Sequence, residues 1–308
     1  MMASGTPGPC RIGVDLGGTK VEAAVVDVEG TIVDRRRLPT PRADYAATLE
    51  TIGRLVADLE GRAGRTMSVG VGMPGTLSPS TGLVMNANSV WLNGRPLGVD
   101  LQRRLNRPLR FQNDANCFAL SEARDGAGQG HRVVFGVILG TGVGGGLIVD
   151  GRTWTGRNAV GGEWGHNPLP WPGDAERPGP DCYCGRAGCI ETFLSGPGLR
   201  ADHERATGLG WEPGVIAAAA TTGDEAAAST LQRYDARLAR SLAGLVNVLD
   251  PDVIVLGGGL SAMGHLYQTI PALWTPYVFA DHVTTPILPP THGASSGVRG
   301  AAWLWDGE

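Results

Sequence analysis

Three cysteines and one histidine lie close together in the chain and carry the side chains that zinc prefers. Cys182, Cys184 and Cys189 fall within eight residues, and His166 precedes the first of them by sixteen residues. Three thiolates and one imidazole complete a tetrahedral zinc site and leave no position open for water, so the ion would be structural. Free thiols and a disulfide are the alternatives, although a bridge across Cys-x-Cys would be strained. The spacing favours a zinc loop with His166 as the fourth ligand.

Two carboxylates adjoin this predicted loop. Glu191 follows Cys189 by two residues, and Glu163 precedes His166 by three. A zinc loop would hold both carboxylates in fixed positions, as the recognition of a polar substrate requires.

A further acidic residue, Asp114, lies where a predicted strand at Leu109–Gln112 gives way to a predicted helix at Ala115–Arg124. A carboxylate at the carboxyl end of a strand is well placed for catalysis. The alternative is that Asp114 only caps the helix, but the neighbouring Asn113 could supply that cap instead. Asp114 is therefore the candidate general base.

Glycine clusters follow three apolar runs of the sequence. They are Gly17-Gly18, Gly140–Gly146 and Gly257–Gly259. Glycine lets the backbone approach a ligand closely, and the N–H groups of such turns bind anions. Thr19 and Thr141 add hydroxyl donors at matching places. Plain hairpin turns are the alternative for any single cluster, but the three together predict a phosphate site.

Two details qualify this phosphate site. The chain has no G-x-x-x-x-G-K-[ST] motif, so it is not a P-loop protein. Of its 26 basic residues only Lys20 is a lysine, and it lies beside the first glycine pair. A compact point charge there would suit a phosphate, although chance is an equal alternative.

The elements that must position these residues follow from the apolar pattern. We expect three antiparallel strands at Arg11–Leu16, Val21–Val28 and Thr31–Leu38, then a helix at Tyr45–Leu59 and a strand at Ser68–Met73. Later in the chain we expect strands at Val133–Leu139, Gly144–Val149 and Val253–Leu256, and helices at Leu231–Leu249, from Ser261, and at Ser295–Trp305. The strand, glycine-threonine turn and strand near residue 12 recur near residue 133, which suggests two related domains.

Composition sets the broad class. The chain has 308 residues, 42% of them hydrophobic, which suits a globular protein of two domains. With a net charge of −4 and no basic stripe, nucleic acid is not an expected partner.

We expect no targeting segment in Met1–Cys10 and no membrane span, and hence a cytoplasmic protein. An odd number of cysteines, five, argues against a disulfide framework.

Taken together, these segments resemble the ROK family of sugar kinases, which belongs to the actin/hexokinase superfamily. The matching segments run in family order over nearly the whole chain: Asp15–Lys20, Met73–Gly75, Asn113–Asn116, Leu139–Gly144, Glu163–His166, Cys182–Glu191 and Leu256–Gly259. The resemblance implies an α/β, two-domain ribonuclease-H-like fold with a central cleft. It places a small domain at 1–115, completed by a C-terminal helix at about 293–308, and a large domain with the zinc loop at 116–292.

The resemblance also implies roles for individual residues. Asp114 would be the general base. The expected sugar ligands, besides Asp114, are Gly75, Asn88, Asn113, Glu163, His166 and Glu191, and His166 would use one ring nitrogen for zinc and the other for the sugar. Asp15 would help to place Mg²⁺. The expected nucleotide-binding residues are Asp15, Gly17, Gly18, Thr19, Lys20, Thr141, Gly142, Gly257, Gly258 and Gly259.

The implied reaction is ATP-dependent phosphorylation of a free hexose at its 6-hydroxyl, with Mg²⁺ and a structural Zn²⁺ and with a homodimer as the expected assembly. Asn86–Gly94, Gly162–Trp171 and Ser295–Trp303 are most similar to bacterial fructokinases that also accept mannose, so D-fructose is the first expected substrate. Gly142–Ile148 instead resembles glucokinases and N-acetylglucosamine kinases, which keeps glucose, N-acetylglucosamine and N-acetylmannosamine open. A sugar-responsive repressor of the same family is disfavoured, because only ten residues precede the first strand.

Overall fold

The computed structural model describes residues 10–305, which form an α/β protein of two compact units. Within the described residues, the first unit contains 10–126, 151–161 and 294–305, and the second contains 127–150 and 162–293. The expectation of no targeting segment concerns mainly residues 1–9, which lie outside the described residues. The predicted domains at 1–115 and 116–292 stay a prediction; by their contacts, residues 116–126 and 151–161 belong to the first unit.

The first unit is built on a five-stranded sheet in the order β3-β2-β1-β4-β7. The bounds are β1 (Arg11–Leu16), β2 (Lys20–Val26), β3 (Ile32–Pro39), β4 (Ser68–Met73) and β7 (Arg110–Asn113). The first three strands are antiparallel, as the sequence predicts, and β4 and β7 run parallel to β1. A small ladder of β5 (Thr76–Leu77) and β6 (Val84–Met85) follows β4.

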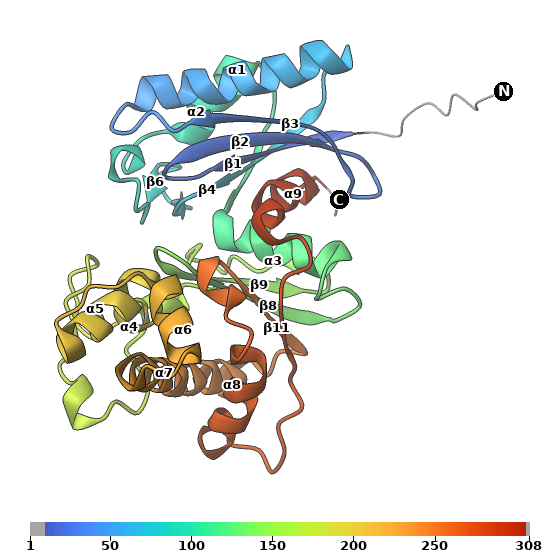
Figure 1. The fold of residues 1–308 in the computed structure, drawn as a ribbon. Coiled ribbons are helices and arrows are strands. Elements are labelled where there is room, and N and C mark those ends of the chain that lie inside the picture. The colour runs from blue at the N-terminus through green and yellow to red at the C-terminus, as the bar shows by residue number, and fades with distance from the viewer. Residues whose placement is uncertain (1–9, 306–308) are drawn as a thin grey trace. The chain divides into compact units, whose positions relative to one another are not determined.

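Helices cover both faces of this sheet (Figure 1). On one face lies α1 (Tyr45–Ala63), with α2 (Leu97–Leu105) beside it. The apolar stripe of α1 is buried with Ile52, Val56 and Leu59 against the strands. On the other face lies α9 (Ser296–Trp303), which packs on α3 (Asp114–Asp125).

The last helix can lie on the sheet because two strand residues have no side chain. A Cβ atom at Gly13 of β1 would stand 1.8 Å from the carbonyl oxygen of Val298, and one at Gly70 of β4 would stand 1.9 Å from that of Ala301. The backbone of α9 therefore rests directly on β1 and β4. The C-terminal helix thus packs on two strands of the first unit.

The sheet of the second unit contains β9 (Val143–Val149), β8 (Val133–Leu139), β11 (Val253–Gly257) and β12 (Ile287–Leu288) in this order. β8 and β9 form a hairpin, and β11 and β12 run parallel to β8. Both units thus contain a hairpin followed by two parallel strands, as the repeat in the sequence suggests. The short β10 (Arg152–Thr153) follows β9 in the chain.

The helices of the second unit bury a separate core. The long α7 (Glu225–Leu249) packs beside α8 (Leu266–Trp274), α5 (Gly196–Thr207) and α6 (Pro213–Thr221), with α4 (Ile190–Leu194) next to α5 (Figure 1). Where the sequence predicts one helix from Ser261, the chain forms a 3₁₀ turn at Gly259–Ala262 and only then α8. Gly264, a poor helix former, separates the two. Among residues 10–305, no helix has both the length and the apolarity to cross a membrane.

Candidate active site

In the first unit, the candidate base stands at the junction of β7 and α3. Asn113 ends the strand and caps the helix, because its Oδ1 accepts a hydrogen bond from the N–H of Ala115 at 2.9 Å. Asp114 also accepts from this N–H, at 2.8 Å. The Nδ2 of Asn113 donates to the carbonyl oxygen of Gly75 at 3.2 Å. The loop after β4 and the residue before the candidate base are therefore joined by one hydrogen bond.

A second carboxylate of the first unit, Asp15 on β1, interacts with Asp114. Burial raises the pKa of Asp15 to about 7, and the neighbouring carboxylates of Asp114 and Glu22 add to this shift. Lys20 and Arg37 oppose it. A divalent cation would relieve the repulsion between Asp15 and Asp114, so this pair of oxygen donors fits Mg²⁺.

The first glycine turn joins β1 to β2. The N–H of Gly17 donates to the carbonyl oxygen of Lys20 at 3.0 Å, and Gly18 and Thr19 are exposed at the tip. The ammonium of Lys20 lies 3.2 Å from the carboxylate of Glu22. The only lysine of the chain thus has a carboxylate partner beside it, and its predicted phosphate contact would have to be shared with this ion pair.

Sequence reasoning missed the buried Glu22. Its side chain is 1% exposed and receives Arg35 at 3.2 Å and Arg37 at 2.6 Å from the edge strand β3, besides Lys20. Two arginines of the run Arg35–Arg37 therefore neutralise a buried carboxylate. Side chains two residues apart on a strand lie on the same face, so the spacing of Arg35 and Arg37 could have indicated a shared carboxylate partner.

The exposed Asn88 lies in a loop of the first unit that a single side chain braces. Asn93 accepts a hydrogen bond from the N–H of Ala87 and donates one to the carbonyl oxygen of the same residue, both at 2.9 Å. The next residue, Ser89, is buried close to Gly18. This loop therefore holds Asn88 near the first glycine turn.

In the second unit, the other two glycine turns border one cavity. Gly140 donates its N–H to the carbonyl oxygen of Gly142 at 3.0 Å, and its own carbonyl accepts from Gly196 at 2.8 Å. Gly258 has φ +82, and a Cβ atom there would lie 2.3 Å from the carbonyl oxygen of Leu139. A cavity of about 730 Å³ has a wall that includes Gly140, Thr141 and Gly259. Its volume suits a nucleoside or a nucleotide.

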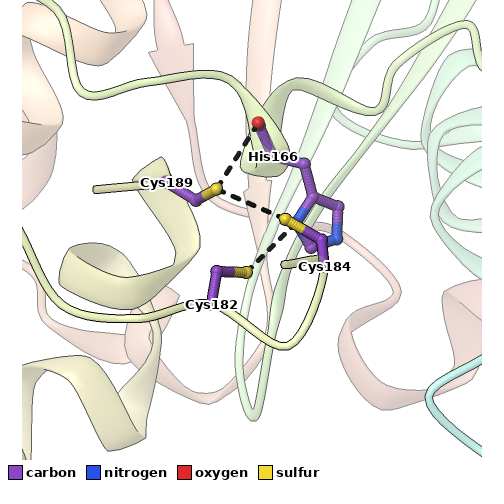
Figure 2. A group of neighbouring side chains, drawn as sticks. All are labelled: His166, Cys182, Cys184 and Cys189. Carbon is purple, nitrogen blue, oxygen red and sulfur yellow. Dashed lines mark hydrogen bonds between the residues drawn. The ribbon is translucent and has the colours of Figure 1, made fainter. Parts of the chain in front are cut away.

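The four predicted zinc ligands converge (Figure 2). Their ligand atoms all lie within 4.8 Å of one another, with Cys182 Sγ 3.5 Å from His166 Nδ1 and Cys184 Sγ 3.6 Å from Cys189 Sγ. A tetrahedral zinc site requires about 3.8 Å between two sulfurs and about 3.6 Å between a sulfur and an imidazole nitrogen. The three cysteines form no disulfide. The arrangement therefore fits a zinc ion.

The second nitrogen of His166 has a partner that the sequence did not indicate. Its Nε2 lies 3.0 Å from the hydroxyl of Tyr183, and the two rings meet edge to face. A sugar contact of His166 would therefore compete with Tyr183 or include it.

Glu163 and Glu191 flank the zinc loop, as predicted. Glu191 is the second residue of α4 and accepts a hydrogen bond from the N–H of Val143 at 2.8 Å, which ties it to the second glycine turn. Glu163 immediately precedes the 3₁₀ turn Trp164–His166. Burial raises the pKa of Glu163 above its usual range, the carboxylate of Glu191 adds to the shift, and His166 opposes it.

The predicted site residues thus form two groups, one in each unit. The first unit holds Asp15, Gly17, Gly18, Thr19, Lys20, Gly75, Asn88, Asn113 and Asp114. The second unit holds Thr141, Gly142, Glu163, His166, Cys182, Cys184, Cys189, Glu191, Gly257, Gly258 and Gly259. The first group contains the candidate base and part of the predicted sugar and nucleotide ligands. The second contains the remaining predicted ligands, the cavity of about 730 Å³ and the candidate zinc loop.

Known proteins match this chain over nearly its full length. The N-acetyl-D-glucosamine kinase of Pectobacterium atrosepticum is 40% identical over 298 residues, which cover 95% of this chain and 97% of that protein. The enzyme of the same name from Escherichia coli is 39% identical over 305 residues, with 95% and 98% covered.

Solved structures extend the likeness to the fold. The ROK hexokinase of Thermus thermophilus matches with a TM-score of 0.84 and 30% identity over 95% of this chain and 96% of that one. A ROK glucokinase from Streptomyces griseus, solved with glucose and AMPPNP, matches with a TM-score of 0.79 and 32% identity over 96% and 98%. These matches confirm the predicted α/β fold of the actin/hexokinase superfamily.

A model of the ROK family matches residues 11–308, almost the full length of the sequence. The two curated relatives named above are sugar kinases. The chain therefore belongs to the ROK family.

Proposed function

We propose that this protein transfers the γ-phosphoryl group of ATP to the 6-hydroxyl of a free hexose, with N-acetyl-D-glucosamine as the first candidate substrate. The observation that carries the proposal is the cavity of about 730 Å³ that the glycine turns at Gly140-Thr141 and Gly259 border in the second unit. The Streptomyces griseus structure contains a nucleotide analogue and a hexose, which supports both substrate classes.

In this reaction Asp114 accepts the proton of the sugar hydroxyl as its oxygen attacks the γ-phosphorus. The bond from that phosphorus to the bridging oxygen of ATP breaks, and ADP leaves. General-base help of this kind contributes about 10²–10⁴ in rate. Asn113 supplies the helix cap that Asp114 would otherwise provide and also fixes the carbonyl of Gly75. The cap on Asn113 supports the assignment of Asp114 as the base, because α3 does not depend on Asp114 alone for its cap.

The other residues bind and orient. In the proposal Asn88, Asn113, Glu163 and Glu191 hold sugar hydroxyls, with the backbone of Gly75 and with His166. The turns with Gly17, Gly18, Thr19, Thr141, Gly142, Gly257 and Gly258 provide N–H and hydroxyl donors for phosphates, and Lys20 adds a charge. Orientation of both substrates, rather than covalent chemistry, is what phosphoryl transfer asks of the protein.

The donor atoms of the candidate site suit two metal ions, Mg²⁺ and Zn²⁺. Asp15 would hold Mg²⁺, which neutralises charge on the phosphates. His166, Cys182, Cys184 and Cys189 would hold Zn²⁺ with no position open, so the ion would stiffen the loop between Glu163 and Glu191.

Two hexoses, N-acetyl-D-glucosamine and D-fructose, are candidates for the sugar substrate. The relatives named above are N-acetyl-D-glucosamine kinases, and they do not support the preference for fructose that the sequence predicts. Fructose stays the second candidate, because Asn86–Gly94 and Gly162–Trp171 resemble fructokinases. An assay of ADP release over N-acetylglucosamine, N-acetylmannosamine, glucose, mannose and fructose decides between them. We expect the highest kcat/KM for N-acetylglucosamine; a higher value for fructose would reverse the order.

Replacement of the base tests the mechanism. Asp114→Ala should lower kcat by about 10²–10⁴-fold, because proton removal from the sugar hydroxyl would lack a base. The thermal unfolding of the variant should stay cooperative, since Asn113 retains the helix cap. Full activity in a folded Asp114→Ala protein would contradict the assignment of the base.

A further inference from the structure

The cavity of the second unit offers mostly small and apolar side chains to its occupant. Three of its lining side chains are polar, namely those of Thr141, Arg200 and Glu212. The remaining wall consists of glycine, alanine, proline, leucine and methionine, for example Pro197 and Met263. Such a wall can hold the flat faces of a purine but has few groups that read its edges. Recognition of the nucleotide beyond its phosphates therefore depends on the few polar side chains.

Arg200 and Glu212 form an ion pair on this wall. Nη1 of Arg200 on α5 donates to Oε1 of Glu212 at 2.6 Å, and the two side chains are 48% and 68% exposed. An exposed pair of this kind contributes little to stability. Glu212 occupies the cap position of α6, yet its side chain makes no capping hydrogen bond. Among residues 10–305, the side-chain partner of this carboxylate is Arg200, and its charge at the start of α6 is favourable for the helix dipole.

The charges of the pair indicate which part of a nucleotide it meets. A carboxylate repels phosphate groups, and the paired guanidinium leaves the two side chains neutral as a unit. A vicinal diol is a neutral donor of two O–H groups, and a carboxylate accepts both in charge-assisted hydrogen bonds. The nucleotide presents such a diol at its ribose. The glycine turn at Gly140 and the hydroxyl of Thr141, on the same wall, are the better partners for phosphates.

We infer that Glu212 binds the 2′- and 3′-hydroxyls of the ribose and so selects ribonucleotides over deoxyribonucleotides, with Arg200 as the residue that positions it. This inference rests on the proposed function, because it assumes that the cavity takes the nucleotide of the kinase reaction.

The test measures nucleotide binding by calorimetry with ADP, 2′-deoxy-ADP and 3′-deoxy-ADP, which does not require turnover. The wild-type protein should bind ADP about tenfold more tightly than either deoxy analogue, as expected for the loss of a charge-assisted hydrogen bond. Glu212→Ala should weaken ADP binding to the level of the analogues, whose own affinity should change little. Asp150→Asn is the matched control, since it breaks the exposed ion pair with Arg132 in the same unit and should preserve the tenfold preference.

Variants of Arg200 separate positioning from direct binding of phosphate. Arg200→Met should reduce the preference for ADP over its deoxy analogues, and Arg200→Lys should restore part of it, because a lysine can still pair with Glu212. In kinetics, Glu212→Ala should raise the KM for ATP about tenfold, with kcat and the KM for the sugar unchanged. If Arg200→Met weakens all three nucleotides equally, Arg200 binds phosphate and its positioning role is refuted.

The outcomes also distinguish the inference from the proposed function. Binding of ADP with no preference in the wild type, or a preference that survives in Glu212→Ala, overturns the inference and leaves the kinase proposal intact. A wild-type protein that binds none of the nucleotides and phosphorylates no hexose with ATP overturns both.

Discussion

Sequence reasoning left open which of two neighbouring residues at the junction of β7 and α3, Asn113 or Asp114, caps the helix. In the structure Asn113 occupies the cap position, and both side chains accept from the N–H of Ala115. The four cysteine and histidine ligands were predictable because three of them lie within eight residues. The pair of Arg200 and Glu212 was not, because its members come from two different helices and carry no motif.

Asp15 gives the stability of the protein a specific dependence on pH. Burial and the neighbouring carboxylate of Asp114 raise the pKa of its carboxyl group from 3.8, the ordinary value of an aspartate, to about 7 in the folded protein. The folded state therefore binds more protons than the unfolded state between these two values, and the free energy of unfolding falls as pH rises. Asp15→Asn removes this term, so in metal-free buffer its stability relative to wild type should increase from about pH 4 to about pH 7 and then level off.

Urea unfolding at a series of pH values, with EDTA present, measures this difference. Asp281→Asn is the control, because Asp281 is exposed and should show no such trend. A constant difference between Asp15→Asn and wild type across the range would refute the raised pKa.

At the scale of elements, the strands with their glycine turns were the easiest part to predict. Apolar runs that end in glycine gave β1, β4, β8 and β11 within a residue at each end. The helices α5 and α6 were missed, because their sequences start with Gly-Pro or Pro-Gly and bury few residues. Short helices of this kind depend on packing against α7 more than on their own pattern.

The zinc loop is the element whose order should depend on a metal. The purified protein should contain about one zinc per chain. Cys184→Ser should lose it and unfold with a free energy lower by about 3 kcal/mol or more, because the energy of binding structural zinc adds to folding. Elemental analysis and chemical denaturation check both effects, and Cys10→Ser, outside the cluster, should keep the metal. A Cys184→Ser protein with full zinc content would contradict the ligand set.

The close packing of α9 on the sheet can be tested by a glycine-to-alanine substitution in β1. Gly13→Ala would place its Cβ 1.8 Å from the carbonyl oxygen of Val298, so α9 would have to move, at a cost of about 3 kcal/mol. Gly61→Ala on α1 is the control, since nothing lies within 4 Å of its added Cβ and it should stabilise the helix by about 0.5–1 kcal/mol. Equal stabilities in urea for the two variants would show that α9 does not lie as described.

At the scale of the whole molecule, the family resemblance gave the fold class, and the apolar pattern alone would not have done so. Periodicity identifies strands, but the order β3-β2-β1-β4-β7 depends on pairings between residues far apart in sequence. The assignment of 151–161 to the first unit was equally beyond the sequence, because these residues follow β9 of the second unit directly. What the pattern did reveal is the repeated hairpin, which both units contain.

The position of α9 has a consequence for synthesis on the ribosome. β1 and β4 leave the exit tunnel before any strand of the second unit, but the helix that covers their second face follows all of these strands in the sequence. Every strand of the second unit is made before α9 emerges. The first unit therefore starts to emerge before the second, but it cannot complete its packing until residues 296–303 have left the tunnel.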